Sequence, residues 1–235
     1  MNVYLAELIG TALLVLMGTG VVANVTLKKT LGHQAGWLAI NFGWAIAVFI
    51  GVFVTAHSSG AHLNPAVTMA LAVLNKITWG KALGYMAAQL VGAMIGAFLA
   101  YIAYKDHYAA TDDGNTILGT FSTGPVLSNP ISNLLTEAVG TFVLVFAVLH
   151  MTDPDYKLGA LDALPVALVV LGIGLSLGGP TGYAINPARD LGPRIVHYLL
   201  PIANKRDSNW SYSWIPIIGP IAGGVIAAVA YQLVG

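Results

Sequence analysis

Long apolar stretches separated by polar connectors dominate the pattern of this chain. A helix needs about 20 apolar residues to cross a bilayer, and six stretches come close to that length. They lie at 3–26, 37–57, 81–104, 130–151, 162–178 and 213–234. Two apolar segments, 65–74 and 187–199, are too short to span, and the polar connectors are 105–129, 152–161 and 200–212. We therefore predict an all-α membrane protein with six transmembrane helices and two re-entrant half-helices.

Both short segments begin at the same motif. The pattern (S/T)-G-x-x-x-N-P-A occurs at 59–66 and again at 181–188. Asn is a favoured N-cap, and Pro suits the first helical position because an N–H there would lack a partner anyway. The motif predicts that each short segment is a helix starting at its Asn-Pro pair. The residues concerned are Asn64, Pro65, Ala66, Asn186, Pro187 and Ala188.

The two halves of the chain share a second motif. E-x-x-G-T opens the first long stretch at Glu7 and the fourth at Glu137. Each half contains three full crossings, and an odd number means that the second half enters from the opposite side. We expect a single channel domain, 1–235, made of two inverted repeats at approximately 1–115 and 125–235.

In such a repeat, the two half-helices enter from opposite faces and their N-termini meet near the midplane. Each N-terminus carries roughly half a positive charge, which makes the centre hostile to cations and protons. If each Asn oxygen caps its helix, the amide N–H groups are free to donate to a solute hydroxyl or water. The carbonyls just before each Asn also need partners, which permeating hydroxyls can supply. These predicted pore-lining carbonyls belong to Gly60, Ala61, His62, Gly182, Tyr183 and Ala184.

Composition supports a membrane protein and excludes several other classes. Hydrophobic residues make up 57% of the chain and charged residues only 9%, against about 25% charged in a soluble domain. A net charge of zero gives no indication of nucleic acid, and the absence of cysteine excludes thiol chemistry. His57 and His62 flank a Ser-Ser-Gly break without a nearby carboxylate, so we expect no metal site. We see no catalytic arrangement and no cofactor motif, and therefore do not expect an enzyme.

These features together resemble the major intrinsic protein family, the aquaporins and glycerol facilitators. The resemblance is carried by His-Leu-Asn-Pro-Ala-Val-Thr at 62–68, Asn-Pro-Ala-Arg-Asp at 186–190 and the paired E-x-x-G-T helices. It covers essentially the whole chain. It implies the aquaporin-like fold, one pore per chain and a homotetramer.

The narrowest point of the family's pore maps, by this resemblance, to Trp44, Gly174, Tyr183 and Arg189. Glycerol facilitators have Trp, Gly, Phe and Arg there, whereas water-selective members usually have His in place of Gly174. The resemblance thus implies a wider filter of the glycerol-conducting branch, as does Asp190 directly after Arg189. Tyr183 is the departure, because its hydroxyl would make one wall more polar and slightly tighter.

The chemistry of these residue types suits a polyol. Trp44 and Tyr183 offer apolar faces to a carbon backbone, and Arg189 offers fixed donors to hydroxyls and repels cations. Glu7 and Glu137 are acids at membrane depth, which we assign to accepting backbone N–H groups of the re-entrant loops. We assign Asp190 to orienting its loop.

The expected function is a passive channel for glycerol, water and other small uncharged solutes, excluding ions and protons. One alternative is a channel tuned to water, hydrogen peroxide or protonated small acids such as lactic acid, which Tyr183 motivates. A secondary transporter would share the inverted repeat, but usually needs a titrating chain inside its helices. An adhesion or scaffold role gains little support because the pore motifs are intact.

The expected location is the cell membrane, where the multi-pass chain contacts lipid. The family resemblance implies that both termini are cytoplasmic. Lysine and arginine oppose this orientation, since Lys76, Lys81 and Lys157 would lie inside while five basic residues, at 28, 29, 105, 205 and 206, would lie outside. We follow the resemblance, because the charge rule is statistical.

Overall fold

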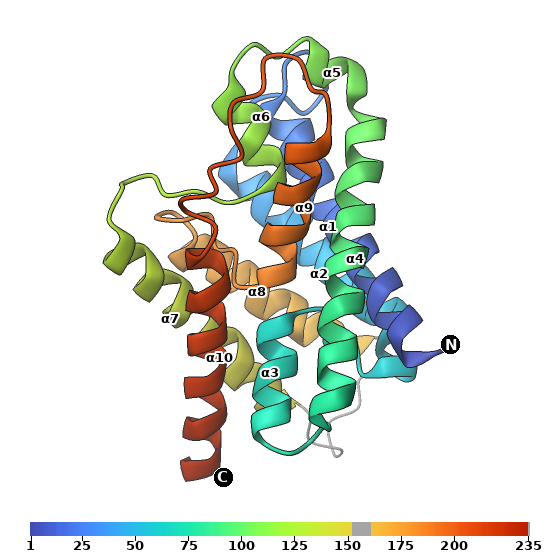
Figure 1. The fold of residues 1–235 in the computed structure, drawn as a ribbon, viewed down its shortest axis with the longest axis vertical. Coiled ribbons are helices and arrows are strands. Elements are labelled where there is room, and N and C mark those ends of the chain that lie inside the picture. The colour runs from blue at the N-terminus through green and yellow to red at the C-terminus, as the bar shows by residue number, and fades with distance from the viewer. Residues whose placement is uncertain (152–160, 235) are drawn as a thin grey trace.

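The computed structural model describes residues 1–151 and 161–234, which form helices joined by loops (Figure 1). Their order along the chain is α1 (Val3–Thr26), α2 (Gly36–Ser59), α3 (Pro65–Val73), α4 (Trp79–Ala103), α5 (Lys105–Ala109), α6 (Gly114–Phe121), α7 (Pro130–Met151), α8 (Leu164–Leu177), α9 (Pro187–Leu199) and α10 (Ile215–Val234). No strand occurs in these described ranges, so the prediction of an all-α fold is confirmed.

Five of the helices, α1, α2, α4, α7 and α10, are long and apolar enough to cross a membrane. They coincide with five of the six predicted stretches to within three residues at each end. The sixth stretch contains α8, an apolar helix of 14 residues. The predicted connector 152–161 lies almost wholly outside the described residues.

The two predicted half-helices are present as α3 and α9. Each has an Asn at its N-cap and a Pro directly after it, as the motif predicts. In Figure 1 they run in opposite directions from the middle of the molecule, with α3 toward one end and α9 toward the other. Their N-termini, where backbone N–H groups lack helical partners, therefore lie at the centre of the bundle.

Close helix contacts at glycine repeat in the two halves. A β-carbon added to Gly92 on α4 would lie 2.2 Å from the carbonyl oxygen of Leu8 on α1. A β-carbon added to Gly223 on α10 would lie 2.1 Å from the carbonyl oxygen of Ala138 on α7. Only glycine permits this approach, so α1 packs on α4 as α7 packs on α10.

The prediction that 105–129 is only a polar connector is wrong, because this segment contains the helices α5 and α6. Asp113 caps α6 by accepting hydrogen bonds from the N–H groups of Asn115 and Thr116, each at 3.1 Å. Hydrogen bonds from Thr116 and Asn115 hold the pKa of the Asp113 carboxyl below its usual range. Ile117 and Phe121 are buried beneath the helix. One turn of apolar residues among polar ones was too short a pattern to predict.

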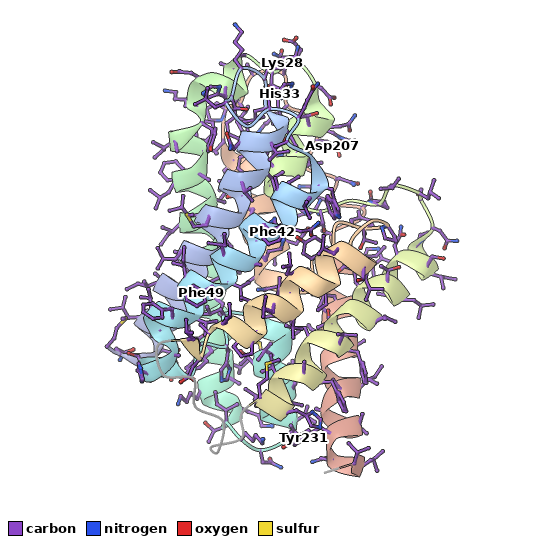
Figure 2. All side chains as sticks on the ribbon, turned by 180° about the vertical axis from the view of Figure 1, so that it is seen from behind. Lys28, His33, Phe42, Phe49, Asp207 and Tyr231 are labelled. Carbon is purple, nitrogen blue, oxygen red and sulfur yellow. The ribbon has the colours of Figure 1, made fainter. Side chains whose placement is uncertain are left out.

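The outer surface matches a membrane-embedded bundle. Lys28 and Asp207 lie at one end of the molecule and Tyr231 at the other, whereas Phe42 and Phe49 lie between them (Figure 2). Large apolar side chains such as Phe42 (49% exposed) are exposed along the helices. An apolar outside is what lipid or neighbouring subunits would cover.

Candidate functional site

A cavity of about 250 Å³ lies at the centre of the bundle, between α1, α2, α7, α8 and the loops before α3 and α9. Half of the site residues expected from the sequence line it: Trp44, Gly60, Ala61, His62, Asn64, Tyr183, Ala184, Asn186 and Arg189. Gly174 and Gly182 are not among the lining residues, and neither are the expected residues of the helix starts and loop supports: Pro65, Ala66, Pro187, Ala188, Glu7, Glu137 and Asp190. The rest of the lining is mainly aliphatic, including Val48, Val52 and Val170.

The two Asn side chains cap the half-helices. The Oδ1 atom of Asn64 accepts a hydrogen bond from the N–H of Ala66 at 2.8 Å. The Oδ1 atom of Asn186 accepts from the N–H groups of Ala188 at 3.0 Å and Arg189 at 3.2 Å. Each carboxamide oxygen is thereby committed, and its amide nitrogen is turned away from the helix.

The amide nitrogens also join the two loops, which corrects the expectation that their N–H groups are free. Asn64 Nδ2 donates to the carbonyl oxygen of Ile185, and Asn186 Nδ2 donates to that of Leu63, both at 2.8 Å. An amide group has two N–H donors, so one of each pair remains for a molecule in the cavity. These cross-loop bonds connect residues more than 120 positions apart, which no local pattern predicts.

The backbone before the two Asn residues repeats an unusual conformation. Gly60, Ala61 and Leu63 have φ of 84°, 48° and 50°. The corresponding residues Gly182, Tyr183 and Ile185 have φ of 81°, 39° and 43°. Left-handed φ is uncommon outside glycine and a marked outlier for a β-branched residue such as isoleucine. The two loops are therefore strained in the same way, and this backbone conformation requires stabilising contacts from the surrounding structure.

Glu7 holds the first loop. Its fully buried carboxylate accepts hydrogen bonds from the N–H groups of His62 at 2.9 Å and Leu63 at 2.7 Å. The hydroxyl of Ser59 donates to it at 2.6 Å and the side-chain amide of Gln89 at 2.8 Å. Four donors satisfy the charge.

Glu137 holds the second loop in the equivalent way. Its buried carboxylate accepts from the N–H groups of Ala184 at 3.0 Å and Ile185 at 2.8 Å. The hydroxyl of Thr181 donates to it at 2.7 Å. Thus the acid of each E-x-x-G-T motif accepts hydrogen bonds from one hydroxyl and from two successive backbone N–H groups. These bonds hold the strained loop backbone beside the cavity.

Arg189 and Trp44 meet in the lining of the cavity. The Arg189 guanidinium carbon lies 4.0 Å from the centre of the Trp44 ring. Its Nη1 atom donates to the carbonyl oxygen of Phe121, the last residue of α6, at 3.4 Å. Trp44 needs Gly18 on α1, where a β-carbon would lie 2.1 Å from its ring. Within the described ranges, the charge is therefore held by stacking and one carbonyl, and its other donors have no partner there.

Asp190 fixes the connector that follows α6. It accepts from both the N–H and the hydroxyl of Thr123 at 2.7 Å, and forms a buried ion pair with Arg194 at 2.8 Å. Arg194 in turn donates to the carbonyls of Ser208 and Thr123. The sequence suggested an orienting role for Asp190 but not these connectors, because its partners lie in segments without a motif.

Tyr183 fills the space that Gly174 leaves. A β-carbon on Gly174 would lie 2.8 Å from Tyr183 Cζ and 2.0 Å from Asn41 Oδ1. The room freed by the glycine is thus taken by these two side chains, and the Tyr183 hydroxyl is buried there. The absence of a side chain at Gly174 therefore makes room for the Tyr183 ring.

Replacing Gly174 with alanine should therefore damage the site. The added methyl must displace Asn41 or Tyr183, and such overpacking costs about 1–3 kcal/mol. We expect a lower Tm in detergent and changed permeability in proteoliposomes. Gly172→Ala, two positions earlier on α8 with open space around it, is the matched control and should alter neither. Equal behaviour of the two variants would contradict this packing.

Two opposed half-helices, joined at their N-termini inside a bundle of membrane-length helices, define an integral membrane protein with a central passage. The chain belongs to the major intrinsic protein family, whose model matches residues 1–231.

Named relatives are similar over nearly the full length. A probable glycerol uptake facilitator protein of Thermotoga maritima is 53% identical, covering 99% of both chains. A glycerol uptake facilitator protein of Streptococcus pneumoniae is 48% identical, again covering 99% of both. The X-ray structure of the aquaglyceroporin from Plasmodium falciparum matches with a TM-score of 0.88 at 31% identity, covering 99% of this chain and 95% of that one.

Proposed function

We propose that this chain is a passive channel that conducts glycerol, water and other small uncharged solutes and excludes ions and protons. The observation that carries the proposal is the wall of the cavity, which combines the hydrogen-bond donors Asn64, Asn186 and Arg189 with many apolar side chains. Two relatives that are 53% and 48% identical to this chain in sequence are named as a probable glycerol uptake facilitator and a glycerol uptake facilitator.

A polyol suits this wall because the lining contains both polar groups and apolar side chains. Its hydroxyls can accept from the spare amide N–H of Asn64 and of Asn186, and donate to carbonyls of the loops before them. Its carbon backbone can pass along Trp44 and the valines of α2 and α8. Each hydrogen bond to water is thereby exchanged for one to the wall, so the cost of leaving water stays low.

Ions would gain no such compensation. The N-termini of α3 and α9 both point their partial positive charge at the centre, and Arg189 adds a full charge in the cavity lining. A cation would meet this repulsion while shedding its hydration. The second N–H of the Asn64 and Asn186 side chains, which the cross-loop bonds leave over, would donate to water at the centre. A water there would be forced to accept, which opposes proton transfer along a chain of waters.

The whole chain would act as one channel domain with two inverted repeats, approximately 1–115 and 125–235. Support comes from the matching φ pattern of the two loops, the equivalent bonds of Glu7 and Glu137 and the repeated glycine contacts. We also propose a homotetramer in the cell membrane with both termini in the cytoplasm. The exposed apolar helix faces fit lipid and neighbouring subunits.

The rival class, a gradient-driven carrier, differs in its kinetics. The cavity lining contains few ionisable side chains among the described residues, namely His62, Asp162, Tyr183 and Arg189, whereas a coupled carrier usually needs a titrating chain. In proteoliposomes, we expect labelled glycerol uptake that does not saturate and does not respond to a proton or sodium gradient. Saturable uptake that follows either gradient would favour the carrier and contradict the channel.

A further inference from the structure

One face of α2 turns toward α8 and the second re-entrant loop. Trp37, Asn41 and Trp44 recur at the i, i+4 and i+7 spacing of a single helix face. Trp37 donates through its indole Nε1 to the carbonyl oxygen of Gly174 at 3.2 Å, and its ring meets the Tyr183 ring edge-on at 5.7 Å. Asn41 lies between the two tryptophans on this face and is fully buried.

Two buried polar atoms, one on this face and one on the Tyr183 ring beside it, lack partners within the described part of the chain. Asn41 uses its Nδ2 to donate to the carbonyl oxygen of Trp37 at 2.9 Å, but its Oδ1 has no donor. The buried hydroxyl of Tyr183 has no partner either. A buried polar group without a partner is costly. A carboxamide oxygen accepts and a phenol can donate, so the two deficits are complementary.

The two groups are also neighbours. The point where a Gly174 β-carbon would lie is 2.0 Å from Asn41 Oδ1 and 2.8 Å from Tyr183 Cζ, the carbon that bears the hydroxyl. The same ring lies over Gly178, whose β-carbon would be 2.5 Å from Tyr183 Cδ1. The ring thus packs on α8, with Asn41 beside its hydroxyl.

We propose that Asn41 is a positioning residue for solute selectivity that acts through Tyr183. Its carboxamide oxygen accepts a hydrogen bond from the Tyr183 hydroxyl through one bridging water, and this holds the ring against α8. A ring held there fixes the width of the cavity opposite Arg189, and its hydroxyl does not compete for the solute. The proposal rests on the function proposed above and adds the residue that sets its size limit.

The test is a double-mutant cycle of Asn41→Ala and Tyr183→Phe. Stopped-flow light scattering on proteoliposomes would give the permeabilities to water, glycerol and the longer polyol erythritol. Asn41→Ala frees the ring and opens space behind it, so the erythritol-to-water ratio should rise at least about threefold, as losing one modest hydrogen bond allows. Tyr183→Phe should raise the ratio in the same direction. The double variant should exceed the larger single effect only slightly, because both changes break the same contact.

Controls separate selectivity from folding. Phe42→Leu changes the adjacent, exposed residue of α2 and should leave every ratio as in the original chain. A variant that merely folds poorly lowers all permeabilities together and does not change their ratio. If Asn41→Ala yields no folded protein, Asn41→Ser, which keeps a polar group but not its reach, should shift the ratio in the same direction.

An unchanged ratio in the folded Asn41 variants, or fully additive effects in the double variant, would overturn the proposal. The proposed function fails separately, if the original chain conducts water but no glycerol. In that case the appearance of glycerol flux in Asn41→Ala would still support the positioning role. Continued exclusion of glycerol would overturn it.

Discussion

Replacing Glu137 with leucine should prevent the chain from forming a stable channel. The change leaves the N–H groups of Ala184 and Ile185 and the hydroxyl of Thr181 buried without an acceptor. Each such loss costs about 1–3 kcal/mol, and together they approach the whole stability of a typical domain, about 5–15 kcal/mol. The strained φ of Ile185 would also lose its restraint. Thermal unfolding in detergent, followed by size-exclusion chromatography, measures the effect.

Two further variants define the Glu137 experiment. Glu137→Gln keeps one acceptor oxygen, so its Tm should fall between those of the original chain and the leucine variant. Asp106→Asn, which changes an exposed acid on α5, should have no measurable effect. A leucine variant with an unchanged Tm and normal water permeability would show that the second loop does not depend on this carboxylate.

Replacing Arg189 with valine should weaken the exclusion of cations and protons. The change removes the full positive charge beside Trp44 and opens the cavity, while the caps at Asn64 and Asn186 stay intact. We expect proton or cation conductance to rise at least about tenfold, corresponding to a barrier lowered by about 1.4 kcal/mol, with water permeability retained. A pH-sensitive dye inside proteoliposomes, under an imposed membrane potential, reports the leak.

The control for Arg189 removes a positive charge elsewhere. Arg206→Gln changes an exposed arginine in the connector before α10 and should leave the conductance at the level of the original chain. If Arg189→Val also leaves it there, exclusion must depend on the half-helix N-termini alone, and the assigned role of Arg189 is wrong.

The parts of the fold that the sequence predicts well are those encoded by local pattern. Long apolar stretches locate the long helices, and the Asn-Pro pairs locate the starts of α3 and α9, because capping is decided within three or four residues. The apolar pattern does not predict the helix α6 in the connector 105–129, because Ile117 and Phe121 give it only a single buried turn. Its cap at Asp113 is the one signal that could have revealed it.

The sequence predicts the features of the candidate site that repeat in the two halves. It does not predict the contacts that form between distant segments. The paired acids Glu7 and Glu137 stand out because each opens a repeat. The cross-loop bonds of Asn64 and Asn186 do not, since each partner lies in the other half. Asn41 carried no motif at all, and only the structure brings it next to Gly174. Packing between non-local segments therefore decides details of the site that no local pattern predicts.

The most direct test of the account is stopped-flow light scattering on proteoliposomes of the unmodified chain, comparing an impermeant osmolyte with glycerol. A glycerol channel predicts fast shrinkage in both, followed in glycerol alone by fast re-swelling as solute and water enter. Fast shrinkage in glycerol without re-swelling, as in the impermeant osmolyte, would contradict the central claim. It would leave a water channel that excludes glycerol.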